Sequence, residues 1–211
     1  NILDQSYHND VKQIIALSTD KAAAPVNLYG ATKLCSDKLF VSANQFYGYK
    51  FKSSVVRYGN VINSRGSVLP IFKSQKNKKY LTITHKEMTR FNISLDEGVN
   101  TIFYAIKNSK GGEIFVPKLS SYKVVDLAKA VSPECKFKFI GIRSGEKIHE
   151  EMITTSDAIT ALDLGKMYVI LPSNGKYNFN NYDKKKKFKK LKLGFRYSSD
   201  TNNKFLSIKE L

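Results

Sequence analysis

Tyr29 and Lys33 are four residues apart, a spacing that places both side chains on one face of a helix, one turn from each other. An ammonium group beside a phenol stabilises the phenolate and lowers its pKa from about 10. A tyrosine of this kind can take the proton from a sugar or alcohol hydroxyl. Thr19 ends the apolar run before this helix, where its hydroxyl can hydrogen-bond the same oxygen. The set predicts a base that acts on the hydroxyl of a sugar or alcohol.

Asp20 and Lys21 lie between the apolar run and the helix. One interpretation is a general acid beside a general base, which requires a raised pKa for the carboxyl and a lowered pKa for the amine. The other is a turn with an exposed ion pair. From the residue types alone, the exposed turn is favoured.

Short apolar runs alternate with amphipathic segments along the chain. The runs predict strands at residues 13–19, 52–62, 81–84, 113–117, 136–142 and 167–172. The amphipathic segments predict helices at residues 28–48, 67–77, 94–112, 122–132 and 146–153, with Asn27 as an N-cap and Ser94 with Glu97 as a capping box. This alternation predicts an α/β fold with a mainly parallel sheet.

The chain has 211 residues, and 35 Lys and Arg against 18 Asp and Glu give it a net charge of +17. The block KKKKFKK at 184–190 would suit an anionic surface, but no nucleic-acid motif accompanies it, so a solvated basic face is the favoured interpretation. No apolar run is long enough to span a membrane. Two cysteines predict buried, reduced thiols in a cytoplasmic protein, and three histidines without ligand spacing predict no metal site.

The Thr19, Tyr29 and Lys33 set resembles the short-chain dehydrogenase/reductase signature. Longer strings resemble one branch, the inverting UDP-N-acetylglucosamine 4,6-dehydratases of pseudaminic acid synthesis and flagellin glycosylation. These strings are STDKAAAPVNLYGATKLCSDKLF, RYGNVINSRGSVLPIF, EMTRFNISLDEGV, GGEIFVPKLSSYKVVDLAKA, IGIRSGEKIHEEMI and YSSDTNNKFLSIKEL. The resemblance covers nearly the whole chain. One departure is Ala24, which stands where the family often has Asn.

The resemblance implies the C-terminal part of a Rossmann-type doubly wound parallel sheet plus a smaller α/β substrate-binding domain. No G-x-G-x-x-G turn for a dinucleotide pyrophosphate is present, so we expect a C-terminal fragment that is inactive by itself. Residues 1–62 would be the remainder of the cofactor domain. Residues 63–172 would be mainly the nucleotide-sugar region, with 94–117 returning to the Rossmann sheet, and 173–211 a basic tail.

The resemblance also implies the reaction. Tyr29 would take the O4 proton while C4 is oxidised by NADP, or alternatively NAD. Lys21 would remove the C5 proton, Asp20 would protonate the departing 6-hydroxyl, and the hydride would return to C6. The implied catalytic residues are therefore Asp20, Lys21 and Tyr29.

Binding residues follow from the same motifs. For the cofactor they are Thr19, Tyr29, Lys33 and Val61. For UDP-N-acetylglucosamine they are Lys21, Asn60, Arg65, Gly66, Ser67, Val68, Arg90, Arg143 and Glu146, with the two arginines Arg90 and Arg143 on the diphosphate. A homo-oligomer is expected, with neither nucleic acid nor membrane as a partner. Two alternatives stay open: a UDP-sugar 4-epimerase, which would not use Asp20 and Lys21 as acid and base, and a non-catalytic UDP-sugar-binding remnant.

Overall fold

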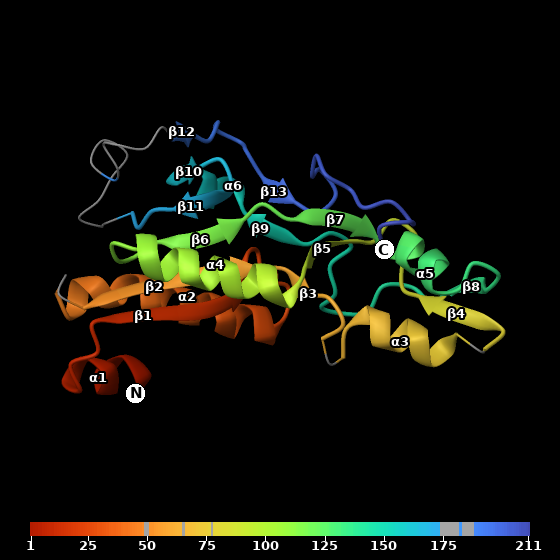
Figure 1. Cartoon of the computed structure of the whole chain (residues 1–211), viewed down its shortest axis with the longest axis horizontal. Coiled ribbons are helices and arrows are strands. Elements are labelled where there is room, and N and C mark those ends of the chain that lie inside the picture. Colours follow the sequence, from red (N-terminus) through yellow and green to blue (C-terminus); the bar gives the residue numbers. More distant parts are fainter. Residues whose placement is uncertain (49–50, 65, 77, 174–181, 183–187) are drawn as a thin grey trace.

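The computed structural model describes residues 1–48, 51–64, 66–76, 78–173, 182 and 188–211. A sheet covered by helices occupies one end of the elongated molecule, and a smaller group of helices and short strands occupies the other (Figure 1). Most of the predicted basic block at 184–190 lies outside the described residues. Among the described residues, no helix is long and apolar enough to cross a membrane.

The main sheet has six strands in the order β1-β2-β6-β11-β10-β12. Their bounds are β1 (Gln13–Thr19), β2 (Lys52–Tyr58), β6 (Ile114–Pro117), β11 (Met167–Ile170), β10 (Ala161–Asp163) and β12 (Lys189–Lys190). β1, β2 and β6 are parallel, whereas β11, β10 and β12 each join antiparallel to their neighbour. The predicted α/β fold is confirmed, with β1, β2 and β6 parallel, and β11, β10 and β12 extend the sheet antiparallel at one edge. The reason is that short turns, with no crossover helix, connect β10 and β11.

Two long helices cover opposite faces of this sheet. Val55 of β2 packs in a cluster with Phe40 of α2 (Leu28–Phe46), whereas its neighbour Val56 packs in a cluster with Ala105 of α4 (Leu95–Asn108). Successive side chains of a strand point to opposite faces, so a continuous apolar run is what a strand buried on both sides requires. The predicted caps are confirmed: Asn27 accepts from the amide of Gly30, and Ser94 with Glu97 forms a capping box.

The smaller region is built from two further sheets. One has the order β3-β5-β7, with β3 (Asn60–Val61), β5 (Thr89–Ile93) and β7 (Ser120–Lys123). The other pairs β4 (Tyr80–Ile83) with β8 (Lys136–Phe139), next to α3 (Val68–Gln75) and α5 (Val124–Val131). The predicted strand 52–62 is thus two strands in different sheets, because the chain leaves the main sheet after Tyr58.

The remaining elements are α1 (Ile2–His8), which lies beside the main sheet far from the smaller region, and four short elements nearer the junction (Figure 1). The four are the 3-10 turn η1 (Asp20–Ala22), β9 (Glu151–Ile153), α6 (Thr155–Ala158) and β13 (Tyr197–Ser198). The predicted helix at 146–153 is wrong, because β9 pairs antiparallel with β13 and buries both Met152 and Ile153. The expectation of buried thiols is also wrong for Cys35, which is exposed.

Candidate active site

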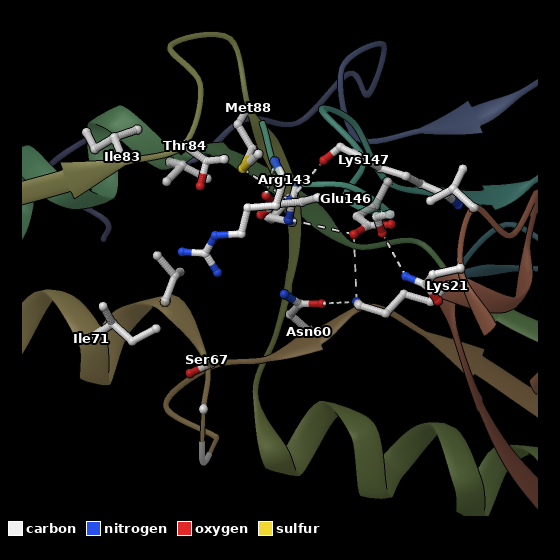
Figure 2. Close-up of a pocket in the computed structure, with 18 of the residues that line it drawn as sticks. Lys21, Asn60, Ser67, Ile71, Ile83, Thr84, Met88, Arg143, Glu146 and Lys147 are labelled. Atoms are coloured by element: carbon white, nitrogen blue, oxygen red, sulfur yellow. Dashed lines mark hydrogen bonds and ion pairs between the residues drawn. The ribbon is translucent and has the colours of Figure 1, made fainter. Parts of the chain in front are cut away.

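Lys21 lies where the ends of β1 and β2 meet. β1 and β2 are parallel and in register, so the residues that follow them lie at the same edge of the sheet. Lys21 in η1 follows β1, and Asn60 in β3 follows β2. The Lys21 Nζ donates to Asn60 Oδ1 at 3.1 Å, and the two side chains point toward each other at one end of a cavity (Figure 2).

Asp20 is fully buried beside this lysine, with 0% of the residue exposed. Its Oδ1 accepts from the Thr19 hydroxyl at 2.9 Å and from Lys21 Nζ at 3.0 Å. Its Oδ2 is buried without a hydrogen-bond partner among the described residues. An exposed turn, favoured by the residue types alone, is therefore wrong for this pair.

Glu150 brings a second buried carboxylate to the same lysine. Its Oε1 lies 3.7 Å from Lys21 Nζ and 3.7 Å from Arg90 Nε. Burial raises the pKa of Glu150, and the charge of Asp20 adds to this, while Lys21 and Arg90 oppose it. Sequence reasoning missed this residue, because it lies in the segment interpreted as a helix, where an acidic side chain is ordinarily solvated.

The lysine is held in its charged form in this arrangement. Burial by itself lowers the pKa of Lys21, but Asp20 and Glu150 outweigh burial, so its pKa lies above the ordinary 10.5. The expected lowering is wrong for this state of the site. Lys147 shows the opposite balance: burial lowers its pKa, and its Nζ donates to the Ala23 carbonyl at 2.5 Å.

The cavity beside Lys21 has a volume of about 410 Å³. It is lined by most of the residues predicted to bind substrate, namely Lys21, Asn60, Gly66, Ser67, Val68, Arg90, Arg143 and Glu146. Arg65 lies outside the described residues. Glu150, Lys147 and the apolar side chains of Ile71, Phe72 and Met88 also line the cavity and were not predicted.

The two arginines predicted on the diphosphate have different environments. Arg90 is buried, and its guanidinium donates to the carbonyls of Thr89, Lys147 and Ile148. Arg143 is exposed, and its guanidinium projects into the cavity away from Lys21 and Asn60 (Figure 2). Arg143 is therefore the arginine whose donors face the cavity. The donors of Arg90 are used instead to hold β5 to the carbonyls of Lys147 and Ile148.

Tyr29 and Lys33 lie in the first turns of α2, outside the set of residues that line the cavity. Tyr29 is 56% exposed, and Lys33 Nζ donates to the Leu17 carbonyl of β1 at 2.8 Å. Val61 lines a smaller neighbouring cavity together with Asn60. The predicted cofactor residues thus lie at the carboxyl end of β1, beside the predicted substrate residues.

Comparison with known proteins gives the family. The family model described as "Polysaccharide biosynthesis protein" matches residues 1–172. The chain belongs to this family. A UDP-N-acetylglucosamine 4,6-dehydratase (inverting) from Campylobacter jejuni subsp. jejuni serotype O:23/36 (strain 81-176) is 49% identical over 100% of the chain and 65% of the relative. A UDP-glucose 4-epimerase from Rickettsia canadensis (strain McKiel) is 39% identical over 86% of the chain and 55% of the relative.

Solved structures confirm the predicted fold class. Pen from Bacillus thuringiensis matches with a TM-score of 0.85 and 32% identity, over 99% of this chain and 64% of that one. DesIV, a dTDP-glucose 4,6-dehydratase from Streptomyces venezuelae, matches with a TM-score of 0.62 and 16% identity, over 70% of this chain and 53% of that one, which shows the fold alone. The chain spans about two thirds of the length of the curated dehydratase it matches.

The arrangement of charges at this site can support proton transfer between Asp20 and Lys21. Asp20 and Lys21 share a hydrogen bond, one carboxylate oxygen is left without a partner, and a second buried carboxylate stabilises the ammonium. No cluster of three or more His, Cys, Asp or Glu that could hold a metal occurs in the part of the chain that the structure describes.

Proposed function

We propose that the protein containing this chain is an inverting UDP-N-acetylglucosamine 4,6-dehydratase. The observation that carries the proposal is the Asp20–Lys21 pair at one end of the cavity, where a fully buried carboxylate and a partly exposed ammonium are joined by a 3.0 Å hydrogen bond. The identity of 49% to a relative of that name over the whole chain supports it. The substrate is then a nucleotide sugar, and the reaction removes water across C5 and C6.

Oxidation at C4 makes the C5 proton acidic enough to remove. Tyr29 takes the proton of the 4-hydroxyl, and Lys33, fixed to the Leu17 carbonyl, supplies the positive charge on the same helix face. A nicotinamide cofactor, when bound, accepts the hydride from C4 and returns it to C6. Tyr29 and Lys33 of α2 fit such a group, because the phenol of Tyr29 is exposed and the half-buried Lys33 is held at β1 by the Leu17 carbonyl.

The elimination needs a neutral amine and a protonated carboxyl, whereas the resting pair carries the opposite charges. Transfer of one proton from Lys21 Nζ to Asp20 Oδ1 along their hydrogen bond produces both reactive forms at once. Lys21 then takes the C5 proton, and Asp20 gives its proton to the departing 6-hydroxyl, which leaves as water. The pair is then back at its starting charges. When the hydride returns to C6, C5 takes a proton from solvent and Tyr29 releases the O4 proton to solvent, so loss of one water is the only net change.

The diphosphate binds at the other end of the cavity in this proposal. α3 begins after Ser67, which makes no side-chain cap hydrogen bond, so the first amides of the helix remain available to an anion. Arg143 projects into the same space and can form paired hydrogen bonds to phosphate oxygens.

The motif resemblance supports finer proposals as well. The cofactor is NADP, the product enters pseudaminic acid synthesis in the cytoplasm, and the enzyme is a homo-oligomer. A 4-epimerase is the second candidate, favoured by the 39% identity to the Rickettsia relative. Such an enzyme needs no acid and base at C5 and C6, so the hydrogen-bonded Asp20–Lys21 pair at the end of the cavity favours the dehydratase.

Incubation of the full-length protein with UDP-N-acetylglucosamine and analysis by NMR tests the proposal. We expect a 4-keto-6-deoxy sugar without net consumption of cofactor, and one solvent deuterium at C5 when the reaction is run in deuterated water. A C4 epimer as the sole product would establish the second candidate instead.

A further inference from the structure

Glu150 joins the two cations of the site and has no role in the proposed chemistry. Its side chain is 5% exposed, and Oε1 lies 3.7 Å from both Lys21 Nζ and Arg90 Nε. Its Oε2 is buried with no hydrogen-bond partner among the described residues. A buried carboxylate without a full set of hydrogen bonds is costly, and such groups commonly serve a functional site.

The main chain of Glu150 is fixed by the C-terminal segment. The Ser199 amide donates to the Glu150 carbonyl at 2.8 Å, and the Glu150 amide donates to the Ser199 hydroxyl at 2.9 Å. The Ser198 hydroxyl reaches the same carbonyl at 3.2 Å, and the Ser199 hydroxyl is also 2.6 Å from that of Thr89 on β5. With its backbone held from two elements, Glu150 keeps its carboxylate beside Lys21.

The charges around this carboxylate come from every element packed against it. They are Asp20 and Lys21 from η1, Arg90 from β5, and Lys147 from the segment of Glu150 itself. Around Lys21, the anions are Asp20 and Glu150 and the opposing cation is Arg90. Glu150 is thus one of two anions that keep the lysine charged against the effect of burial.

We propose that Glu150 is a positioning residue, which holds the Lys21 ammonium at the end of the cavity and sets the pH range in which Lys21 can act as a base. The second half of this statement rests on the proposed function. Asp20, at 3.0 Å, exchanges the proton with Lys21, and Glu150, at 3.7 Å, determines how tightly that proton is held. Removing its charge makes the neutral amine more abundant at a given pH.

Competitive labelling of lysines with acetic anhydride, read by mass spectrometry over a series of pH values, measures this directly in the full-length protein. A unit charge 3.7 Å away changes a pKa by about one unit even when screened as in water. We therefore expect the pH midpoint of Lys21 labelling to fall by at least about one pH unit in Glu150→Gln. At a given pH, the neutral amine of Lys21 is then about tenfold more abundant. Glu150→Asp keeps the negative charge, so its Lys21 midpoint should stay close to that of the wild-type protein.

Glu151→Gln is the matched control, because Glu151 is adjacent but is not among the charges acting on Lys21. An unchanged Lys21 midpoint in Glu150→Gln, or an equal shift in Glu151→Gln, would overturn the proposal. Circular dichroism checks that each variant folds. If Glu150→Gln does not fold, labelling of the wild-type protein still tests the proposal. The pH midpoint of Lys21 labelling must then lie above 10.5 and above the midpoint of Lys147. A lower midpoint for Lys21 overturns the proposal.

The pH dependence of C5 deuterium exchange then tests the link to the reaction. Its lower limb should move to lower pH in Glu150→Gln by the same interval as the labelling midpoint, which a purely structural defect would not cause. A labelling shift without a matching move in exchange would refute the role in setting the working pH. Failure of the proposed function is distinguishable, because labelling of Lys21 does not depend on turnover.

Discussion

The carboxylate of Asp37 on α2 forms an ion pair with the guanidinium of Arg57 on β2, with 3.1 Å between Oδ2 and Nη2 and each side chain 2% exposed. The other terminal nitrogen of Arg57 reaches the Met152 carbonyl at 3.0 Å and Asp157 at 3.1 Å. One buried arginine thus joins the helix that carries Tyr29 to the sheet and to the segment that follows Glu150. Its position explains how a site built from distant parts of the chain keeps its shape.

Removing one member of this pair should therefore be costly. We expect Asp37→Ala to reduce the free energy of unfolding by about 3 kcal/mol, because the buried guanidinium then keeps Asp157 as its one carboxylate partner among the described residues. Urea denaturation of the intact protein measures the loss. The double variant Asp37→Leu with Arg57→Met should lose less than Asp37→Ala, and an equal or greater loss would show that the charges are not the cause.

Glycine-to-alanine substitutions in the two long helices should have opposite effects. A methyl group at Gly30 would overlap the Lys21 carbonyl oxygen and lie 2.9 Å from Pro25 Cβ, so we expect a loss of about 1–3 kcal/mol and displacement of the Lys21 turn. At Gly98 the nearest atom is an Ile93 methyl at 4.0 Å, so alanine should stabilise the protein by about 0.4–1 kcal/mol. Thermal unfolding of both variants is the check. A stable and active Gly30→Ala protein would contradict the close approach.

Ala24 is held in a backbone conformation that suits asparagine better. Its φ is +46°, in the left-handed region where a β-carbon is strained and where Asn is several-fold enriched over most residues. Ala24 is exposed, so a larger polar side chain meets no core. We expect Ala24→Asn to stabilise the protein by up to about 1 kcal/mol. Ala31→Asn, near the start of α2, is the control and should destabilise by about 0.5 kcal/mol. A change in the free energy of unfolding that has the same sign in both variants would contradict this explanation.

Substitution of Lys21 and of Tyr29 should stop the proposed reaction at different steps. Lys21→Met should still oxidise C4, so that reduced nicotinamide accumulates as new near-ultraviolet absorbance while C5 does not exchange with deuterated water. Tyr29→Phe should suppress the reduced nicotinamide itself. Each loss should be about 10²–10⁴-fold in rate, the usual contribution of a positioned base. Rapid C5 exchange in Lys21→Met would assign the base to another residue.

Asp200 should make the stability of the C-terminal segment depend on pH. Partial burial raises its pKa, but the hydroxyl of Ser198 and the nearby cations Arg196 and His149 outweigh burial and hold it below 3.8. A carboxyl with a lowered pKa stabilises the fold above pH 3.8, and this contribution is lost as the pH falls through the folded-state pKa. Asp200→Asn should cost about 1 kcal/mol at pH 7 and nothing in strong acid. Denaturation curves from neutral to acidic pH measure this. Asp10→Asn, at an exposed ion pair, should show no comparable change.

Local signals predicted the elements that depend on local interactions. Asn27 and Ser94 cap the helices as their residue types indicate, and the apolar runs at 13–19 and 113–117 contain β1 and β6. The interpretation of 146–153 as a helix was wrong because its alternative partner, β13, lies about fifty residues later in the chain. Strand pairing over such a distance leaves no periodic signal in either segment.

The sequence by itself determined the residue types of the site and the family resemblance, from Asp20 and Lys21 to the cavity residues around Arg143. It did not determine their environment. Only the tertiary structure placed Glu150 beside Lys21 and directed the donors of Arg90 into carbonyl groups. The physical reason is that proton affinity depends on burial and on charges within a few ångströms, which are contributed by η1, β5 and the segment before β9. These elements are up to 130 residues apart in the chain, and folding alone brings their charges together.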